Sequence, residues 1–226
     1  MKIATWNVNG IRARQAQVQE WMEMEKPALL CLQELKAAPE QVPRALVEMD
    51  GYWHCWHGQK GYSGVGLHVR RDLAPEAPVF SHPEFDFECR VASVDLGDLT
   101  VLSCYVPNGG KDFSAKMRFL ADLQDHVRDL LVQGRHVLLC GDLNVTRSDL
   151  DVHPKEIRKK AIGQLPEERQ ALDELLGLGL VDLTRMLHPE EAGIYTWWPP
   201  WRQMRERNIG WRIDYILASS EMAATA

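Results

Sequence analysis

Polar side chains suited to metal binding and hydrolysis follow three apolar runs of the sequence, each where the run ends. The residues are Asn7 and Asn9, then Glu34, then Asp142 and Asn144. A hard cation such as Mg²⁺ takes carboxylate and amide oxygens and keeps positions for water and substrate phosphate. Taken singly, each of these residues is also typical of an ordinary turn. Their recurrence at three run ends favours one shared site.

The runs that lead to these residues are short and rich in Val, Ile, Leu and Cys, a composition typical of buried β-strands. This pattern predicts strands over residues 2–8, 28–32, 65–70, 90–96, 100–106, 137–140 and 212–218. Apolar residues at helical spacing predict helices over 13–24 and 114–132. The mixed order predicts an α/β fold, in which ligands bind beyond the strand ends. No low-complexity linker divides the chain, so we expect one domain over residues 1–226.

Composition and charge narrow the function classes. The formal charge of the 226-residue chain is −6, which argues against a nonspecific coat on nucleic acid but allows a local basic groove around an acidic metal site. No apolar run has the length of a membrane span, and the first residues lack a secretory signal, so we expect a cytoplasmic protein. The cysteines show no C-x-x-C spacing, so we expect buried reduced thiols at Cys31, Cys55, Cys89, Cys104 and Cys140.

Tryptophans and arginines interleave near the end of the chain, between residues 197 and 211. The segment contains Trp197, Trp198, Trp201, Trp211, Arg202, Arg205 and Arg207, broken by the single acid Glu206. Aromatic side chains that stack and arginines that grip phosphates are what a binder of damaged strands needs. The alternative is that the tryptophans belong to the core and the arginines to a solvated face.

Six motifs occur in one order along the chain. They are WNVNGIR at 6–12, LQE at 32–34, GYSG at 61–64, YVPN at 105–108, GDLN at 141–144 and NIGWRIDY at 208–215. Together they resemble the exonuclease III family of apurinic/apyrimidinic endonucleases, in the endonuclease/exonuclease/phosphatase superfamily, over nearly the whole chain. The resemblance implies a four-layer α/β sandwich of two packed mixed β-sheets flanked by helices.

The resemblance also implies a role for each matching residue. Asn7 and Glu34 correspond to ligands of Mg²⁺, for which Mn²⁺ is a substitute. Asp142 matches the aspartate that orients or deprotonates the attacking water, and Asn144 the amide that stabilises the pentavalent transition state. Tyr105 matches a tyrosine against the scissile phosphate, and Asp214 an aspartate that supports the family's catalytic histidine.

The DNA-binding residues of the family also have counterparts in this sequence. Trp197, Trp211 and Ile213 match a pocket for the flipped-out abasic sugar, whose size excludes a normal nucleotide. Positions that contact the duplex backbone match Arg12, Gly61, Tyr62, Asn108 and Lys111. The expected partner is double-stranded DNA with abasic sites, bound by a monomer associated with a bacterial-type nucleoid. The basic group at residues 155–160 is more typical of a solvated face, so it stays outside the predicted site.

The expected activity is hydrolysis of the DNA backbone 5′ to abasic sites, with 3′-to-5′ exonuclease and 3′-end-cleaning activity. One family motif, Ser-Asp-His-x-Pro, has no counterpart in the sequence as given. We expect reduced hydrolysis without it, and favour a chain given without this segment over a protein that has lost it. The alternatives are a noncatalytic or impaired damaged-DNA-binding protein and another phosphodiesterase of the superfamily, such as a phosphoinositide phosphatase.

Overall fold

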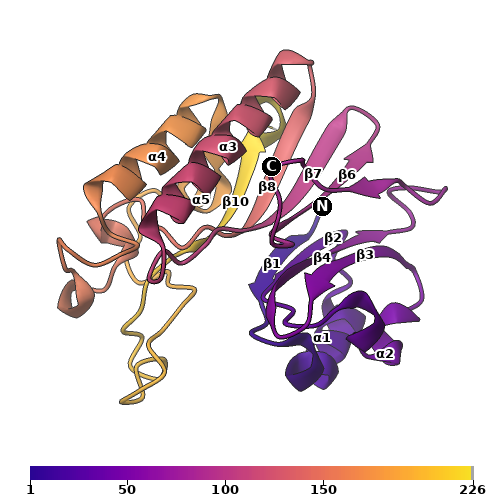
Figure 1. The fold of residues 1–226 in the computed structure, drawn as a ribbon, viewed down its shortest axis with the longest axis horizontal. Helices are drawn as coiled ribbons and strands as arrows, with labels where there is room; N and C mark the ends of the chain where they lie inside the picture. The colour runs from indigo at the N-terminus through magenta and orange to yellow at the C-terminus, as the bar shows by residue number, and fades with distance from the viewer. Residues whose placement is uncertain (225–226) are drawn as a thin grey trace.

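The computed structural model describes residues 1–224 as two β-sheets packed face to face, with helices on the outer side of each (Figure 1). The four-stranded sheet has the order β1 (Ile3–Asn7), β2 (Leu29–Gln33), β4 (Tyr62–Arg70), β3 (Tyr52–Gln59). The six-stranded sheet has the order β5 (Phe80–Ser81), β6 (Val91–Leu96), β7 (Leu99–Tyr105), β8 (His136–Asp142), β10 (Asp214–Ser219), β9 (Leu180–Asp182).

Helices cover the outer face of both sheets. The larger ones are α1 (Ile11–Glu25) on the four-stranded sheet and α3 (Phe113–Val132) and α4 (Pro166–Gly177) on the six-stranded sheet. The short helices are α2 (Arg44–Val47), α5 (Leu183–Leu187) and α6 (Ser220–Ala223), with 3-10 turns at Pro39–Gln41, Asp149–Asp151 and Pro154–Glu156. No helix within residues 1–224 has the length and apolar character needed to cross a bilayer.

The apolar runs are continuous because their strands are buried on both faces. In β2, Leu29 and Cys31 pack between the two sheets, whereas Leu30 and Leu32 face the layer of α1. In β8, Leu138 points to the inter-sheet core and its neighbours pack under α3 and α4. Strands covered on both sides lose the apolar/polar alternation of half-exposed sheets. Two sheets and two helical layers therefore form three apolar cores.

The fold predicted from the sequence is confirmed: two mixed sheets lie between helical layers. All seven predicted strands and both predicted helices are present, with ends shifted by a few residues. The predicted strand over 212–218 begins only at Asp214 as β10, because the Arg212 side chain is buried in an ionic network beside it. Seven further strands and α-helices in the described part of the chain were not predicted: β3, β5, β9, α2, α4, α5 and α6.

All five cysteines are free thiols, as predicted. Cys31, Cys104 and Cys140 are buried in the strands, whereas Cys55 and Cys89 are only half-buried. Burial raises the pKa of the Cys55 thiol, which keeps it protonated and poorly reactive near neutral pH.

Candidate active site

Three predicted catalytic residues stand in one row across the six-stranded sheet. Tyr105 at the end of β7 is the register partner of Asp142 at the end of β8, since these two strands run parallel. Asp214 opens the antiparallel strand β10 and pairs with Asp142 from the other side. The row Tyr105–Asp142–Asp214 therefore comes directly from strand register.

The side-chain amide of Asn7 connects this row with the end of the four-stranded sheet. The Asn7 Nδ2 atom donates to Glu34 Oε1 at 3.0 Å and to Asp142 Oδ2 at 2.8 Å. The Tyr105 hydroxyl donates to the same Glu34 oxygen at 2.7 Å. The five predicted residues Asn7, Glu34, Tyr105, Asp142 and Asp214 thus form one cluster, with both sheets contributing.

The backbone at these strand ends adopts conformations that side chains seldom take. Glu34 has φ 55° and Asn144 φ 53°, both in the left-handed region. Such conformations cost on the order of 1–3 kcal/mol each and are frequent at functional sites. At Gly141, a Cβ atom would lie 1.8 Å from the carbonyl oxygen of Cys104. Glycine therefore lets β8 approach β7 closely beside Asp142.

Negative charge is concentrated in this cluster. Burial and the nearby charge of Asp214 raise the pKa of Asp142 well above its ordinary value. Burial and the charge of Glu34 raise the pKa of Asp214 to about 6. Burial also acts to raise the pKa of Glu34, but hydrogen bonds from Asn7, Lys36 and Tyr105 outweigh it and lower that pKa. Proximity to Glu34 adds to burial in raising the pKa of the Tyr105 phenol.

These residues fit a hard divalent cation. Asp214 Oδ1 is buried and has no hydrogen-bond partner within residues 1–224, and burial together with neighbouring carboxylates raises the pKa of Asp142 and of Asp214. Carboxylates of this kind hold Mg²⁺ when water and phosphate complete its shell. Asn7 presents its amide nitrogen to the cluster, while its Oδ1 accepts the Asn9 N–H at 3.0 Å. Ligation through that oxygen, as predicted, needs the amide to rotate.

Asn144 is held beside the row by its backbone and its side chain. Its N–H donates to Asp142 Oδ1 at 2.9 Å, and its Nδ2 donates to the carbonyl oxygen of Val106 at 2.9 Å. The Asn108 amide donates to Asn144 Oδ1 at 3.3 Å. The predicted DNA contact Asn108 and the predicted catalytic amide Asn144 therefore belong to one hydrogen-bonded unit.

A buried lysine stabilises the backbone at Asn144. Lys116 of α3 donates to the Asn144 carbonyl at 2.8 Å and forms an ion pair with Glu168 of α4. Both side chains have no solvent-exposed surface. Glu168 Oε2 also accepts the N–H of Gly163 at 2.6 Å. The sequence reasoning missed Lys116, whose only signal is a lysine on the inward side of an amphipathic helix.

The structure brings together the three residues of the predicted sugar pocket, which itself stays a prediction. Trp197 and Trp211 exchange backbone hydrogen bonds of 2.8 and 2.9 Å, and their rings meet edge to face with centroids 5.4 Å apart. Ile213 is buried next to them, and its N–H and that of Asp214 both donate to Thr196 Oγ1 at 3.1 Å. Thr196 therefore links the pocket wall to the catalytic row.

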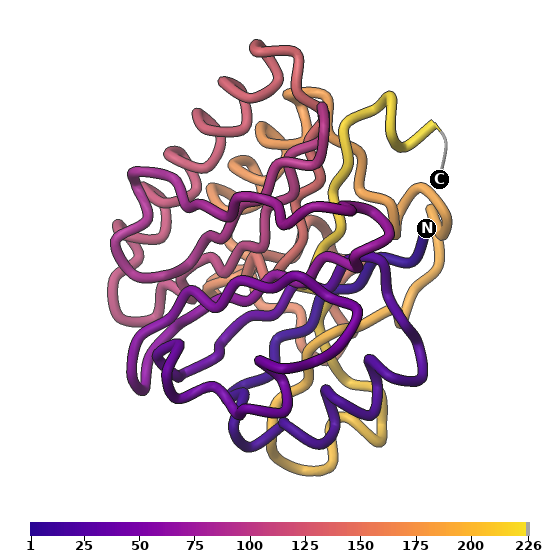
Figure 2. The backbone as a smooth tube through the Cα atoms, turned by 90° about the vertical axis from the view of Figure 1, so that its right-hand side faces the viewer, coloured from indigo at the N-terminus to yellow at the C-terminus, as the bar shows by residue number. Residues whose placement is uncertain are grey.

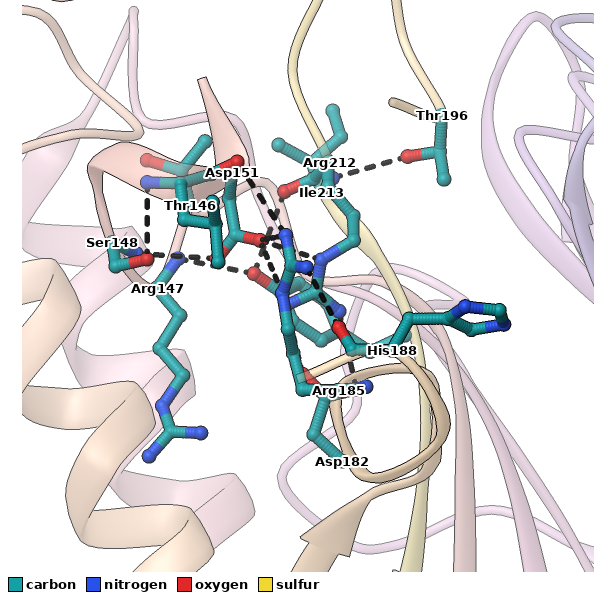
Figure 3. Close-up of polar contacts among 12 residues, drawn as sticks. Thr146, Arg147, Ser148, Asp151, Asp182, Arg185, His188, Thr196, Arg212 and Ile213 are labelled. Carbon is teal, nitrogen blue, oxygen red and sulfur yellow. Dashed lines mark hydrogen bonds and ion pairs between the residues drawn. The ribbon is translucent and has the colours of Figure 1, made fainter. Parts of the chain in front are cut away.

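A buried ionic network anchors the chain between the two pocket residues Trp211 and Ile213 (Figure 3). Asp151 Oδ1 accepts from Arg212 Nε at 2.7 Å and from Arg185 Nη2 at 2.6 Å. Arg212 also pairs with Asp182 at 2.8 Å. Because burial of Arg212 is complete, its side chain fixes the course of the backbone between Trp211 and Ile213.

The segment from Thr196 to Glu206 and the N-terminal part of the chain flank a groove of about 1100 Å³. Asn7, Asp214, Arg14 and Arg205 are among the residues that line it. Figure 2 shows both this gold segment and the indigo chain around helix α1 at the lower edge of the molecule. The groove connects the catalytic cluster with basic side chains.

The predicted contacts to duplex DNA lie at the surface. Arg12, Gly61, Tyr62, Asn108 and Lys111 are all exposed. Hydrogen bonds of Arg90 connect Tyr62 with the cluster. The sequence did not point to a role for Arg90. Arg90 donates to the Tyr62 hydroxyl at 2.6 Å and to the carbonyl oxygen of Tyr105 at 3.3 Å. All five residues stay predictions as DNA contacts.

A second missed residue is Lys36, which lies two positions after Glu34. Its ammonium pairs with Glu34 Oε2 at 2.8 Å and donates to Asn9 Oδ1 at 2.5 Å. The short spacing from Glu34 was the signal that could have revealed it. Asn9, noted in the sequence beside Asn7, thus helps to hold the lysine next to Glu34, the predicted metal ligand.

Comparison with known proteins places this geometry in a family. The model of the endonuclease/exonuclease/phosphatase family matches residues 4–226. Exodeoxyribonuclease III of Haemophilus influenzae is 34% identical over 238 residues, covering 99% of this chain and 89% of its own. The curated relatives differ in length: the chain spans 33% of Recombination repair protein 1 of Drosophila melanogaster.

Solved structures agree with this assignment. An AP endonuclease from Archaeoglobus fulgidus superposes with a TM-score of 0.89 at 32% identity, covering 99% of this chain and 88% of the other. A 3′ phosphatase from Neisseria, solved bound to a product DNA hairpin, gives a TM-score of 0.89 at 36% identity, with 99% and 88% covered. On its sequence, its two-sheet fold and its catalytic row, the chain belongs to the endonuclease/exonuclease/phosphatase family and, within it, to the exonuclease III type of AP endonucleases.

Proposed function

We propose that this protein is a Mg²⁺-dependent DNA-repair phosphodiesterase that cuts the backbone 5′ to abasic sites and also removes blocks and nucleotides from 3′ ends. The observation that carries the proposal is the row Tyr105–Asp142–Asp214, joined through Asn7 to Glu34. The relatives support a nuclease, and their printed names include AP endonuclease, exodeoxyribonuclease III and 3′ phosphatase.

Hydrolysis of a phosphodiester needs an in-line water and a group that takes its proton. Asp142 is the proposed base, since it is buried, it is hydrogen-bonded on both carboxylate oxygens, and burial and the charge of Asp214 raise its pKa. A base with its pKa near the working pH is the most effective one. The Asn7 and Asn144 N–H groups fix the direction of both its oxygens.

Charge that develops on the phosphate needs donors that are already in place. Asn144 is proposed to supply one amide N–H, because its Nδ2 has two hydrogens and Val106 accepts only one. Tyr105 is proposed to supply its hydroxyl, which points into the cluster at Glu34. A raised pKa keeps that phenol protonated and able to donate.

A divalent cation at Glu34 and Asn7 would neutralise phosphate charge and ease departure of the 3′-oxygen. Glu34 suits this position because its lowered pKa keeps it ionised. Asp214 is proposed to orient a further group in the cluster through Oδ1, which has no partner in the described part of the chain.

Substrate selection is proposed to come from the Trp197, Trp211 and Ile213 pocket. Ile213 is buried and the two rings meet edge to face, so the wall is apolar and suits a sugar that carries no base. Enzymes that act on damaged nucleotides take them out of the stack into such pockets. Exposed Arg12, Tyr62 and Lys111 would position the duplex without reading its sequence.

The test uses three labelled DNA substrates: a duplex with one abasic site, the same duplex undamaged, and a duplex with a 3′-phosphate. Incision of the abasic strand that requires Mg²⁺ and leaves a 3′-hydroxyl is the expected result. Release of inorganic phosphate from the third substrate is the expected result for 3′-end cleaning, which the Neisseria relative favours. Binding of abasic duplex without any incision in Mg²⁺ would instead assign a damage-recognition role.

A further inference from the structure

A second cluster of metal-ligating side chains lies outside the catalytic site. His57 is near the end of β3, His82 follows β5, and Asp86 lies in the loop before β6. Each offers a ligand atom, and the three atoms lie within 4.8 Å of one another. None of the three belongs to the Asn7, Glu34 and Asp142 cluster, and the sequence reasoning did not single them out.

The carboxylate of this cluster is fixed in place before any ligand arrives. The Asp86 side chain has no exposed surface. Its Oδ1 accepts the N–H of Arg90 at 2.8 Å, and its Oδ2 accepts the N–H of Val91 at 3.0 Å. Burial acts to raise the pKa of Asp86, but the hydrogen bonds from His57 and these amides lower it. Asp86 is therefore a buried, rigid anion.

The two imidazoles lie against this anion. His57 Nε2 is 2.8 Å from Asp86 Oδ2, and the His57 and His82 rings stack with centroids 4.5 Å apart and planes 11° from parallel. His57 is half-buried, whereas His82 is exposed. Two of the three ligands, Asp86 and His57, are thus held in place by the fold. The exposed His82 imidazole can turn toward them.

We propose that His57, His82 and Asp86 bind one Zn²⁺ ion. Two imidazoles and a carboxylate are a ligand set that Zn²⁺ takes readily, whereas Mg²⁺ prefers oxygen ligands alone. Tetrahedral zinc with bonds of about 2.1 Å sets its ligand atoms roughly 3.4 Å apart. His57 Nε2 and Asp86 Oδ2 are 2.8 Å apart, so these two atoms would move slightly apart as zinc replaces their hydrogen bond, and a rotation of His82 would bring in the third ligand. A water molecule would complete the shell.

The ion would tie the loop that carries His82 and Asp86 to the edge strand β3. That loop ends at Arg90, whose guanidinium lies over the rings of Tyr62 and Tyr105 at 5.3 and 5.0 Å. Zinc binding would therefore stiffen the wall between the catalytic row and the exposed Tyr62. Ligands that bind only the folded state raise its stability, which provides a readout independent of DNA cleavage.

The test measures Zn²⁺ binding to the full chain in excess Mg²⁺, by competition with a chromogenic chelator. All proteins carry Glu34→Gln, which weakens binding of zinc to the catalytic cluster. The expected result is one Zn²⁺ per chain, an affinity at least tenfold weaker in His82→Ala, and an affinity unchanged in His188→Ala. His188 is the matched control because it is an exposed histidine that also lies 2.7 Å from a carboxylate, that of Glu191.

Thermal unfolding gives a second readout for the same proteins. Zn²⁺ should raise the melting temperature of the parent and of His188→Ala, and should not raise that of His82→Ala. His57→Gln, which keeps a donor for Asp86, should behave as His82→Ala does. Equal zinc affinity in His82→Ala and the parent, or no zinc binding in excess Mg²⁺, would overturn the proposal. Neither result bears on cleavage of abasic DNA, so the two proposals fail separately.

Discussion

Asp142 and Asp214 are direct cross-strand partners in the antiparallel ladder between β8 and β10. Two carboxylates thereby occupy neighbouring strand positions at a largely buried edge, and the charge of Asp214 helps to raise the pKa of Asp142. Buried carboxylates that interact in this way share their protons. The raised pKa makes the ionised form of Asp142 a stronger proton acceptor than an ordinary carboxylate, which suits a general base for water.

The first prediction concerns Asp142→Asn. The amide keeps the shape of the side chain but cannot accept the proton of water, so turnover on abasic duplex should fall by roughly 10² to 10⁴. Affinity for the duplex should change less than threefold, since the substituted oxygen faces Asn7 rather than the surface. Single-turnover cleavage and fluorescence anisotropy measure the two quantities. Asp173→Asn is the control, an exposed carboxylate paired with Arg147; cleavage by Asp142→Asn at the control rate would refute the assignment.

The second prediction concerns Lys116→Met. Loss of one partner leaves Glu168 as a buried unpaired charge, so the free energy of unfolding should fall by about 3–5 kcal/mol in urea titrations. Lys116→Met with Glu168→Gln should be more stable than Lys116→Met alone. Both variants should also lose turnover, because Lys116 no longer holds the Asn144 carbonyl.

The control for this ion pair is Lys2→Met, which breaks the exposed pair between Lys2 and Glu25. An exposed pair contributes about 0–1 kcal/mol, so its unfolding curve should nearly overlay that of the parent. If Lys116→Met were as stable as Lys2→Met, the buried pair would have no part in holding the Asn144 loop.

The third prediction concerns the sugar pocket. Trp197→Ala opens the wall opposite Trp211 and should weaken binding to abasic duplex about tenfold, roughly 1.4 kcal/mol. Binding to undamaged duplex should stay the same, because no nucleotide enters the pocket there. Trp201→Ala is the matched control, since Trp201 is 56% exposed. Equal losses on both duplexes would show that Trp197 contacts DNA outside a lesion pocket.

The fourth prediction concerns acid stability. His68 on β4 is fully buried, and burial together with the charge of His54 lowers its pKa to about 3 from an ordinary 6.5. The unfolded chain therefore binds a proton that the folded chain does not, over the window between those two values. Stability should fall as the pH drops through this window, by at most about 1.4 kcal/mol per pH unit for this one group.

His68→Leu should flatten that dependence when urea unfolding is measured at several pH values between 4 and 6.5. His188→Leu, at an exposed position, should leave the slope as in the parent. If stability still falls with decreasing pH in His68→Leu, other groups cause the acid sensitivity. His54 is the first candidate among them, because burial also lowers its pKa.

The sequence predicted the parts of this protein whose signal is local. Asn7, Glu34 and Asp142 each follow a continuous apolar run, and such runs mark strands covered on both faces. β3 was missed because His54, His57 and Gly58 interrupt its apolar residues. It nevertheless forms a strand because β4 supplies a long antiparallel partner, and pairing of this kind overrides a weak intrinsic preference.

The relations between distant residues could not be predicted from spacing. Tyr105 and Asp214 flank Asp142 only because β10 returns antiparallel beside β8. Arg212 was assigned to a strand, whereas its burial depends on Asp151 and Asp182 from two other segments. A lone charged residue in a sequence carries no sign of the partners that tertiary structure brings to it.

The catalytic cluster joins Asn7 in the first strand of the chain to Asp214 in the last. Contacts between residues so far apart in sequence close late in folding, after the chain entropy of the intervening segments has been lost. A nascent or partly unfolded chain can therefore form parts of its β-sheets before Asn7, Asp142 and Asp214 come together. The proposed catalytic site is therefore a property of the folded tertiary structure, and no single segment of the chain contains it.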